Sequence, residues 1–304
     1  MDRENYYKRI KDIFHPEKLE SKKAIIIGLG SGGARVAIEF GRTGVELVLI
    51  DLPDERLEES NIVRHPCGYD SLGKRKSRAV AAYIKNLNPF TKVTHVDLDV
   101  SVEKEKLSDL LARVKPQVIM VCVDNEPAKH SINEIAVRFG ITQIGAGVYD
   151  AGIGGEVTIA RPTSTCYGCI AQHLQLARQA PGTRRTIDYN NLDAAAIRST
   201  CALNLDIEQI ALIQARMGLH ILLEGEPDLT GIPDAVNLCV FCNRPVPDNP
   251  ALARPLHGEF FSIPRDPDCL VCGTFSQGVN EEAERILNSL ETAKKPQTSK
   301  INRA

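Results

Sequence analysis

The sequence lacks the features that mark membrane and secreted proteins. Its 304 residues contain no tryptophan and no apolar run of about 18 residues, which a membrane-spanning helix needs. The first residues, MDRENYYKRIKDIF, have no apolar segment typical of a secretory signal. These absences predict a cytoplasmic protein, in which nine cysteines are expected to be thiols or metal ligands rather than disulfides.

The sequence also lacks an excess of either charge. Its 37 lysines and arginines against 39 aspartates and glutamates give a formal net charge of −2. Nucleic-acid-binding surfaces are usually strongly basic, so nucleic acid is not expected as the main partner. Hydrophobic residues at 43% and charged residues at 25% are ordinary for a soluble protein with a large core.

Short apolar segments alternate with helical segments through the first half of the chain. Such alternation is typical of parallel βαβ units. The predicted fold class is therefore α/β: a Rossmann-like, doubly wound, mostly parallel sheet with helices on both faces. A strand at 157–160 is expected to be a later, antiparallel one. The other strands are predicted at 24–27, 46–50, 92–98, 116–123 and 142–145, with helices at 34–42, 75–86, 102–114 and 127–139.

The chain divides into three parts by composition. Residues 1–22 are predicted to form a helical N-terminal arm, 23–275 one domain, and 276–304 a C-terminal helix with a flexible tail. Within the domain, a polar, loop-rich crossover segment at about 170–204 precedes a long apolar helix at 205–223.

A glycine-rich loop predicts a nucleotide site. Gly28, Gly30 and Gly33 follow the first strand directly and open the first helix. Glycines in this context allow a tight turn and close approach of the backbone to phosphate, which the helix N-terminus also attracts. Asp51 ends the next strand, where it can bind ribose hydroxyls. The loop fits NAD, FAD and ATP equally well, so an NAD-dependent oxidoreductase is one alternative.

The residues that follow favour ATP. Asn61, Arg64 and Lys76 come soon after Asp51, and such groups neutralise polyphosphate and stabilise leaving pyrophosphate. Asp124 ends the strand at 116–123, at the edge where open α/β sheets bind ligands. A carboxylate beside a triphosphate suits Mg²⁺.

Taken together, the segments IIIGLGSGG, EESNIVRH, GKRKSRA and VCVDNEPAKHSIN resemble the ThiF/MoeB/HesA superfamily of ubiquitin-activating-type adenylyltransferases, from about residue 6 to 272. The resemblance implies ATP-dependent adenylation of the C-terminal glycine of a ubiquitin-like or sulfur-carrier protein. A tRNA threonylcarbamoyl-adenosine dehydratase of the same fold is a further alternative.

The same resemblance implies roles for single residues. Asp51 would hold the ribose, Asn61, Arg64 and Lys76 would contact the phosphates, and Asp124 would bind Mg²⁺. Arg9, in a segment similar to the family's RYxRQ, would reach the ATP of a neighbouring subunit, which implies a homodimer. The chain departs from the family pattern at Tyr6, His65 and Lys129, which stand where an arginine, a glutamine and an arginine are usual. It also has two extra residues between Asp51 and Asn61, so that Asp54 rather than Pro53 corresponds to the family's second acidic position.

Three CxxC pairs are candidates for a structural zinc site of four thiolates. A glycine within or after the pair suits a tight knuckle, which favours Cys166, Cys169, Cys269 and Cys272. The resemblance implies the same four ligands. Cys239 and Cys242 are expected in a strand, where sulfurs at i and i+3 point to opposite faces. A site made of Cys239, Cys242, Cys269 and Cys272 remains an alternative.

Cys201 is the candidate nucleophile. It precedes the long apolar helix, and a cysteine near a helix N-terminus has a lowered pKa and more thiolate. The family's transferable cysteine lies in such a segment, so Cys201 would form a thioester with the carrier or carry sulfur. The alternative is a buried core thiol, because the Gly-Val-x-x-Pro usual after this cysteine is absent.

Overall fold

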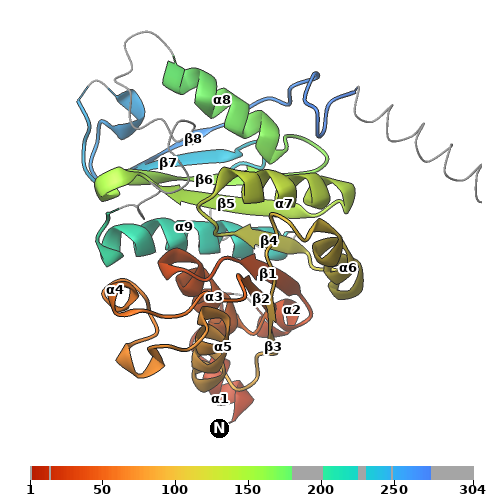
Figure 1. The fold of residues 1–304 in the computed structure, drawn as a ribbon, viewed down its shortest axis with the longest axis vertical. Helices are drawn as coiled ribbons and strands as arrows, with labels where there is room; N and C mark the ends of the chain where they lie inside the picture. Colours follow the sequence, from red (N-terminus) through yellow and green to blue (C-terminus); the bar gives the residue numbers. More distant parts are fainter. Residues whose placement is uncertain (1, 14, 180–200, 225–230, 248, 275–304) are drawn as a thin grey trace, which may run out of the picture.

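The structure, a computed structural model, describes residues 2–13, 15–179, 201–224, 231–247 and 249–274. These residues form an eight-stranded sheet in the order β3-β2-β1-β4-β5-β6-β7-β8 (Figure 1). Strands β1 to β5 are parallel and β6 to β8 are antiparallel, as the sequence predicts for the later strands. Their bounds are β1 Lys23–Ile27, β2 Glu46–Asp51, β3 Val93–Asp97, β4 Val118–Val121, β5 Thr142–Val148, β6 Gly154–Ala160, β7 Leu238–Cys242 and β8 His257–Phe261.

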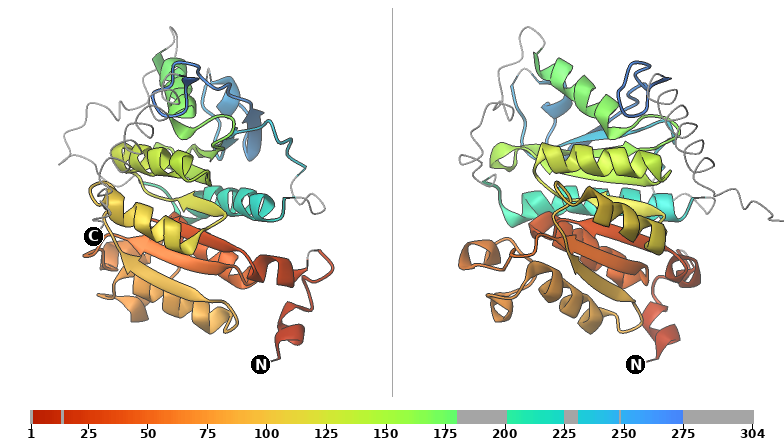
Figure 2. Two further views of the ribbon diagram at one scale, coloured as in Figure 1. Left: turned by 90° about the vertical axis from the view of Figure 1, so that its right-hand side faces the viewer. Right: turned by 45° about the vertical axis from the view of Figure 1, so that its right-hand side comes forward.

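Helices cover both faces of the sheet, which confirms the doubly wound class (Figure 2). Alternate side chains of each central strand pack on opposite faces: Ile26 lies beneath one helix layer and Ile25 beneath the other, both fully buried. Burial on both faces explains why the central parallel strands β1, β2 and β4 are almost entirely apolar. One layer contains α3 Ser31–Thr43, α5 Lys76–Leu87 and α9 Asn204–Leu222, and the other α6 Lys104–Val114, α7 Glu126–Arg138 and α8 Tyr167–Gln179.

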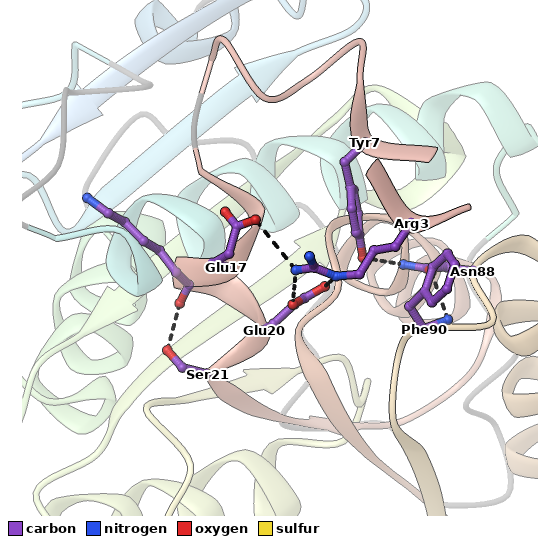
Figure 3. A network of polar contacts seen from close by, with 8 residues as sticks. Arg3, Tyr7, Glu17, Glu20, Ser21, Asn88 and Phe90 are labelled. Carbon is purple, nitrogen blue, oxygen red and sulfur yellow. Dashed lines mark hydrogen bonds and ion pairs between the residues drawn. The ribbon is translucent and has the colours of Figure 1, made fainter. Parts of the chain in front are cut away.

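The N-terminal arm is held by polar contacts at the edge of the sheet where the strands begin (Figure 3). It contains the short helices α1 Arg3–Tyr7 and α2 Pro16–Glu20. The Tyr7 hydroxyl lies 2.9 Å from Nδ2 of Asn88, which precedes β3, and Arg3 pairs with Glu20. The arm therefore lies across the sheet from the glycine loop, which follows the end of β1.

Two features differ from the sequence prediction. Residues 167–179 are helical, whereas a loop-rich crossover was predicted from about 170. The apolar positions Tyr167, Ile170, Ala171 and Leu174 recur at helical spacing and pack α8 against β7. Strand β8 was not predicted. The rest of the crossover, 180–200, and the predicted C-terminal helix and tail, 276–304, lie outside the described residues, and the domain limits at 23 and 275 stay a prediction.

No helix among the described residues is both long and apolar enough to cross a membrane.

Candidate nucleotide site and cysteine cluster

The glycine loop forms a cradle, and glycine stands at each of its three positions for a different structural reason. Gly28 has a φ of +88°, and a Cβ there would lie 2.7 Å from the carbonyl oxygen of Cys122 beyond β4. A Cβ on Gly33 would lie 1.9 Å from the Gly28 oxygen. A Cβ on Gly30 would meet no atom within 4 Å, so this position opens onto free space. Gly28 and Gly33 therefore fix the turn, and Gly30 leaves room for a phosphate at the start of α3.

Asp51 lies directly beside this turn. As the last residue of β2, it accepts hydrogen bonds from the backbone N–H of Leu29 (3.3 Å) and of Leu52 (3.0 Å). Burial raises the pKa of the Asp51 carboxyl to about 6, and the positive charge of Lys76 opposes that rise. The carboxylate is thus ionised at neutral pH and is placed to accept further bonds from ribose hydroxyls.

The predicted phosphate-binding residues occupy the segment that leads from β2 into α5. Lys76 opens α5 and its ammonium pairs with Glu55. The neighbouring Asp54, which the resemblance places at the family's second acidic position, is exposed. Asn61 belongs to the short helix α4, Glu59–Ile62, and its Oδ1 accepts from the Glu58 backbone at 3.1 Å.

Arg64 is half-buried just after α4, where its backbone N–H donates to the Asn61 carbonyl at 2.9 Å. The next residue, His65, has a structural contact that the sequence did not reveal. Its Nδ1 accepts from the Cys67 backbone at 3.1 Å, so Nε2 carries the proton and donates to the Leu29 carbonyl at 3.0 Å. Burial lowers the pKa of His65, which favours this neutral form. His65 thus connects the segment that carries Arg64 to the glycine turn. The only hint of this contact in the sequence was that His65 replaces the glutamine usual in the family.

Asp124 follows the end of β4 and its side chain is exposed. Asn125 begins α7 by accepting a hydrogen bond from the Ala128 N–H at 2.7 Å. The exposed carboxylate is an oxygen donor at the carboxyl edge of the sheet, which fits the coordination chemistry of Mg²⁺.

Cys201 is exposed and precedes α9, so it is not the buried core thiol of the alternative interpretation. The first turn of α9 packs against the helix of the glycine loop: a Cβ on Gly32 would lie 3.7 Å from Ile207. Arg35 of α3 also pairs with Glu208 of α9. The fold therefore sets the start of the helix that follows Cys201 beside the predicted nucleotide site.

Four cysteines far apart in the sequence form one buried cluster. The sulfurs of Cys166, Cys169, Cys269 and Cys272 lie within 4.8 Å of one another. The sulfur–sulfur distances are 3.9 Å for Cys166–Cys169, 3.7 Å for Cys166–Cys269 and 3.5 Å for Cys169–Cys272. Zn–S bonds of about 2.3 Å in a tetrahedron place sulfurs about 3.8 Å apart, so the cluster could hold zinc.

The alternative zinc site is excluded by the faces of β7. Cys239 packs in the core beneath α9, whereas Cys242 packs in the core beneath α8, as expected for i and i+3 in a strand. Among the described residues, only the cluster of Cys166, Cys169, Cys269 and Cys272 brings three or more possible ligand groups close enough together to hold a metal ion. Polar groups also support it: Asn133 Nδ2 donates to Cys166 at 3.6 Å and the Asp266 N–H to Cys169 at 3.5 Å.

Arg9, predicted to contact ATP, lies apart from the other residues predicted for the nucleotide site. It is exposed just beyond α1, on the arm at the edge of the sheet where the strands begin. The glycine turn, Asp51 and Asp124 all lie at the opposite edge, where β1, β2 and β4 end. Arg9 therefore does not contribute to the site of its own chain.

The fold is an open α/β sheet with a glycine turn that suits a nucleotide, and its four-cysteine cluster lies at the start of α8. This chain belongs to the ThiF family, whose model matches residues 8–244.

Curated relatives agree with that assignment. The chain is 29% identical over 155 residues to the SAMP-activating enzyme E1 of Haloferax volcanii, covering 50% of this chain and 54% of that protein. It is 24% identical over 195 residues to ubiquitin-like modifier-activating enzyme 5 of Aedes aegypti, covering 60% of this chain and 48% of that protein. The chain thus spans about half the length of these relatives.

Solved structures share the fold. E. coli MccB with succinimide has a TM-score of 0.65 and 18% identity, and the match covers 88% of this chain and 74% of MccB. PaaA has a TM-score of 0.59 and 17% identity, with 88% of this chain and 76% of PaaA covered. Both matches bear on the fold alone.

Proposed function

We propose that this protein binds ATP at the glycine turn and adenylates the C-terminal glycine of a ubiquitin-like or sulfur-carrier protein. The observation that carries the proposal is the carboxyl edge of the sheet. There the open cradle at Gly30 is flanked by the buried Asp51, the cationic Lys76 and the exposed Asp124. The names of the SAMP-activating and ubiquitin-like modifier-activating relatives support the same reaction class.

The adenylation step needs positioning and charge neutralisation rather than a general base. An oxygen of the carrier carboxylate, already ionised, attacks the α-phosphorus of ATP. The bond from that phosphorus to the bridging oxygen of the β-phosphate breaks, and pyrophosphate leaves with its negative charge. Arg64 and Lys76 would neutralise the phosphates, Asn61 would orient them and Asp51 would hold the ribose. Mg²⁺ on Asp124 would supply further positive charge.

Transfer to Cys201 is the proposed second step. The thiolate attacks the acyl carbon of the adenylate, the carbon–oxygen bond to AMP breaks, and AMP leaves as the thioester forms. Sulfur transfer to the carrier is the other course for this cysteine. The exposure of Cys201 ahead of α9, which packs beside the glycine helix, supports a role for it at this site.

The position of Arg9 supports a two-fold homodimer in which each arm serves the partner's site. Mixing Arg9→Ala and Asp124→Ala chains tests this. If Arg9 acts across the interface, the two inactive proteins restore about a quarter of the activity on mixing, because one site in a mixed dimer receives both intact residues. No recovery, or a monomer in light scattering, would refute the exchange of arms.

ATP–pyrophosphate exchange tests adenylation. Labelled pyrophosphate should enter ATP only when a β-grasp protein with a free C-terminal glycine is added, and removing that glycine should abolish exchange. Exchange with tRNA or with no added acyl substrate would instead favour another reaction. For Cys201, intact mass under non-reducing conditions should show a carrier adduct that Cys201→Ala lacks. An unchanged adduct in that variant would exclude Cys201 as the acceptor.

A further inference from the structure

Tyr167, the first residue of α8, lies along one face of helix α7. This face carries Glu126, His130 and Asn133, which stand at the i, i+4 and i+7 positions of the helix. The Tyr167 hydroxyl donates to Glu126 Oε2 at 2.8 Å, and its ring meets the His130 ring edge-on, with the centroids 5.5 Å apart. The Tyr167 backbone N–H donates to Asn133 Oδ1 at 2.8 Å. One residue of α8 therefore contacts two consecutive turns of α7.

The backbone of Tyr167 is fixed by the cysteine cluster. Tyr167 lies between Cys166 and Cys169, and the sulfurs of both belong to the cluster. Asn133, which accepts the Tyr167 N–H, also donates from Nδ2 to Cys166 Sγ at 3.6 Å. The whole residue is 8% exposed. The cluster thus holds one end of Tyr167, and the hydroxyl at its other end reaches Glu126.

The contact with Glu126 lies at the start of α7, next to the proposed magnesium ligand. Glu126 is the first residue of the helix and follows Asp124 by two positions. Asn125 caps the helix, but its hydrogen bond is to an N–H of the same helix. Within the described part of the chain, the Tyr167 hydroxyl is the only hydrogen-bond partner that joins a side chain of residues 124–126 to another element. A hydroxyl that donates to a carboxylate forms a strong, charge-assisted hydrogen bond.

We propose that Tyr167 is a positioning residue for adenylation: through Glu126 it holds the start of α7 so that Asp124 meets the divalent cation that accompanies ATP. The inference rests on the proposed function, which assigns that cation to Asp124. Groups that orient a metal ligand without touching the metal commonly change metal affinity by about 10- to 100-fold. Tyr167 acts through the backbone between Glu126 and Asp124, so the effect of its hydroxyl is expected below the upper part of that range.

Binding of Mn²⁺ together with a non-hydrolysable ATP analogue tests the inference on the full chain without a carrier protein. Mn²⁺ takes the same oxygen ligands as Mg²⁺, and electron paramagnetic resonance measures its free concentration. Tyr167→Phe removes only the hydroxyl and should raise the Kd of Mn²⁺ by about five- to tenfold. Glu134→Gln is the matched control, because it breaks exposed ion pairs on the same helix, and it should leave the Kd unchanged.

Two further backgrounds separate positioning from a general structural role. In an Asp124→Ala protein, Tyr167→Phe should cause no further change in the Kd of Mn²⁺, because the ligand that it positions is gone. In a Glu126→Ala protein, which lacks the acceptor of the hydroxyl, it should again have no further effect. In ATP–pyrophosphate exchange, Tyr167→Phe should raise the Mg²⁺ concentration needed for half the maximal rate. The rate at saturating Mg²⁺ should stay within about twofold of the wild type.

Equal Kd values for the wild type and Tyr167→Phe would overturn the inference, and so would a loss of affinity that persists in the Asp124→Ala or Glu126→Ala background. Neither result would touch the proposed function, because the wild-type chain would still bind the cation with the ATP analogue. If the wild-type chain binds no ATP analogue, the proposed function fails and this inference with it.

Discussion

Strands β1 to β5 and strands β6 to β8 belong to one sheet, yet the two halves are held together in different ways. The central parallel strands are buried between two layers of helices and carry acidic or basic residues only at their first or last positions. The antiparallel half packs on α8, and Cys166 and Cys169 of the buried cysteine cluster lie at the start of that helix. The comparison teaches that the acidic groups of the proposed nucleotide site gather where the parallel strands end, whereas a buried cysteine cluster that could hold zinc lies at the start of α8 in the other half.

The largest expected effect, which tests whether the two halves are stabilised differently, comes from removing a proposed zinc ligand. Cys272→Ser should lower the free energy of unfolding by about 4 kcal/mol or more, since bound metal stabilises the folded state. Elemental analysis should find one zinc per wild-type chain and much less in the variant, with a fall in melting temperature. Cys242→Ser is the matched control, because this buried cysteine belongs to the same half and its sulfur donates to Leu252 instead. If the Cys272→Ser protein kept its zinc, the proposal that this cysteine cluster stabilises the antiparallel half through zinc would be contradicted.

The next effect concerns the parallel half. Lys76→Ala should reduce carrier-dependent ATP–pyrophosphate exchange by about 100- to 1,000-fold, because a preorganised cation is lost where charge develops. Its melting temperature should change little beside that of the zinc-ligand variant. Lys74→Ala is the control, since Lys74 is exposed two positions earlier. Equal losses from both variants would show that general charge, rather than the position of Lys76, matters.

A smaller effect distinguishes the two roles of glycine in the cradle. Gly28→Ala should destabilise the protein by at least about 2 kcal/mol, because φ is +88° and the new Cβ meets the Cys122 carbonyl. Gly30→Ala should leave stability within about 0.5 kcal/mol and weaken ATP binding. Chemical denaturation and nucleotide titration measure the two effects. Similar unfolding for both variants would contradict the assignment of Gly30 to the ligand.

The smallest effect is a pH dependence. Because the pKa of Asp51 is raised to about 6, the carboxyl takes up a proton as pH falls below that value and loses an acceptor for ribose. The affinity for 5′-sulfamoyladenosine, which carries no titrating phosphate, should then fall by up to about tenfold per pH unit below about pH 6. Asp51→Asn should bind weakly and with no such slope. The same slope in Asp51→Asn would assign the titration to another group.

The sequence predicted those parts of the site in which one position has a strict requirement. Gly28 must adopt a positive φ and Asp51 must end a buried strand, so each is visible in a local pattern. The four cysteines could be chosen because i and i+3 in a strand diverge, and Cys239 and Cys242 do lie on opposite faces.

What the sequence could not predict depends on which distant segments meet. His65 donates a hydrogen bond to the Leu29 carbonyl, and Gln143 donates one to the Asn133 side chain. No local sequence pattern encodes these contacts. Glu55 pairs with Lys76, a contact between the segment after β2 and the start of α5 that no local pattern encodes. Strand β8 is a short edge strand, HGEFF, without the clear alternation that marks a half-buried strand.

The central claim is that this chain activates a carboxylate as an acyl adenylate. The most direct measurement is the intact mass of a candidate β-grasp carrier after incubation with this protein, ATP and Mg²⁺ and a quench in acid. The account predicts a carrier heavier by one adenylyl group, formed with one pyrophosphate released, and absent with the Lys76→Ala protein. A panel of such carriers that all keep their mass while ATP is unchanged would contradict it.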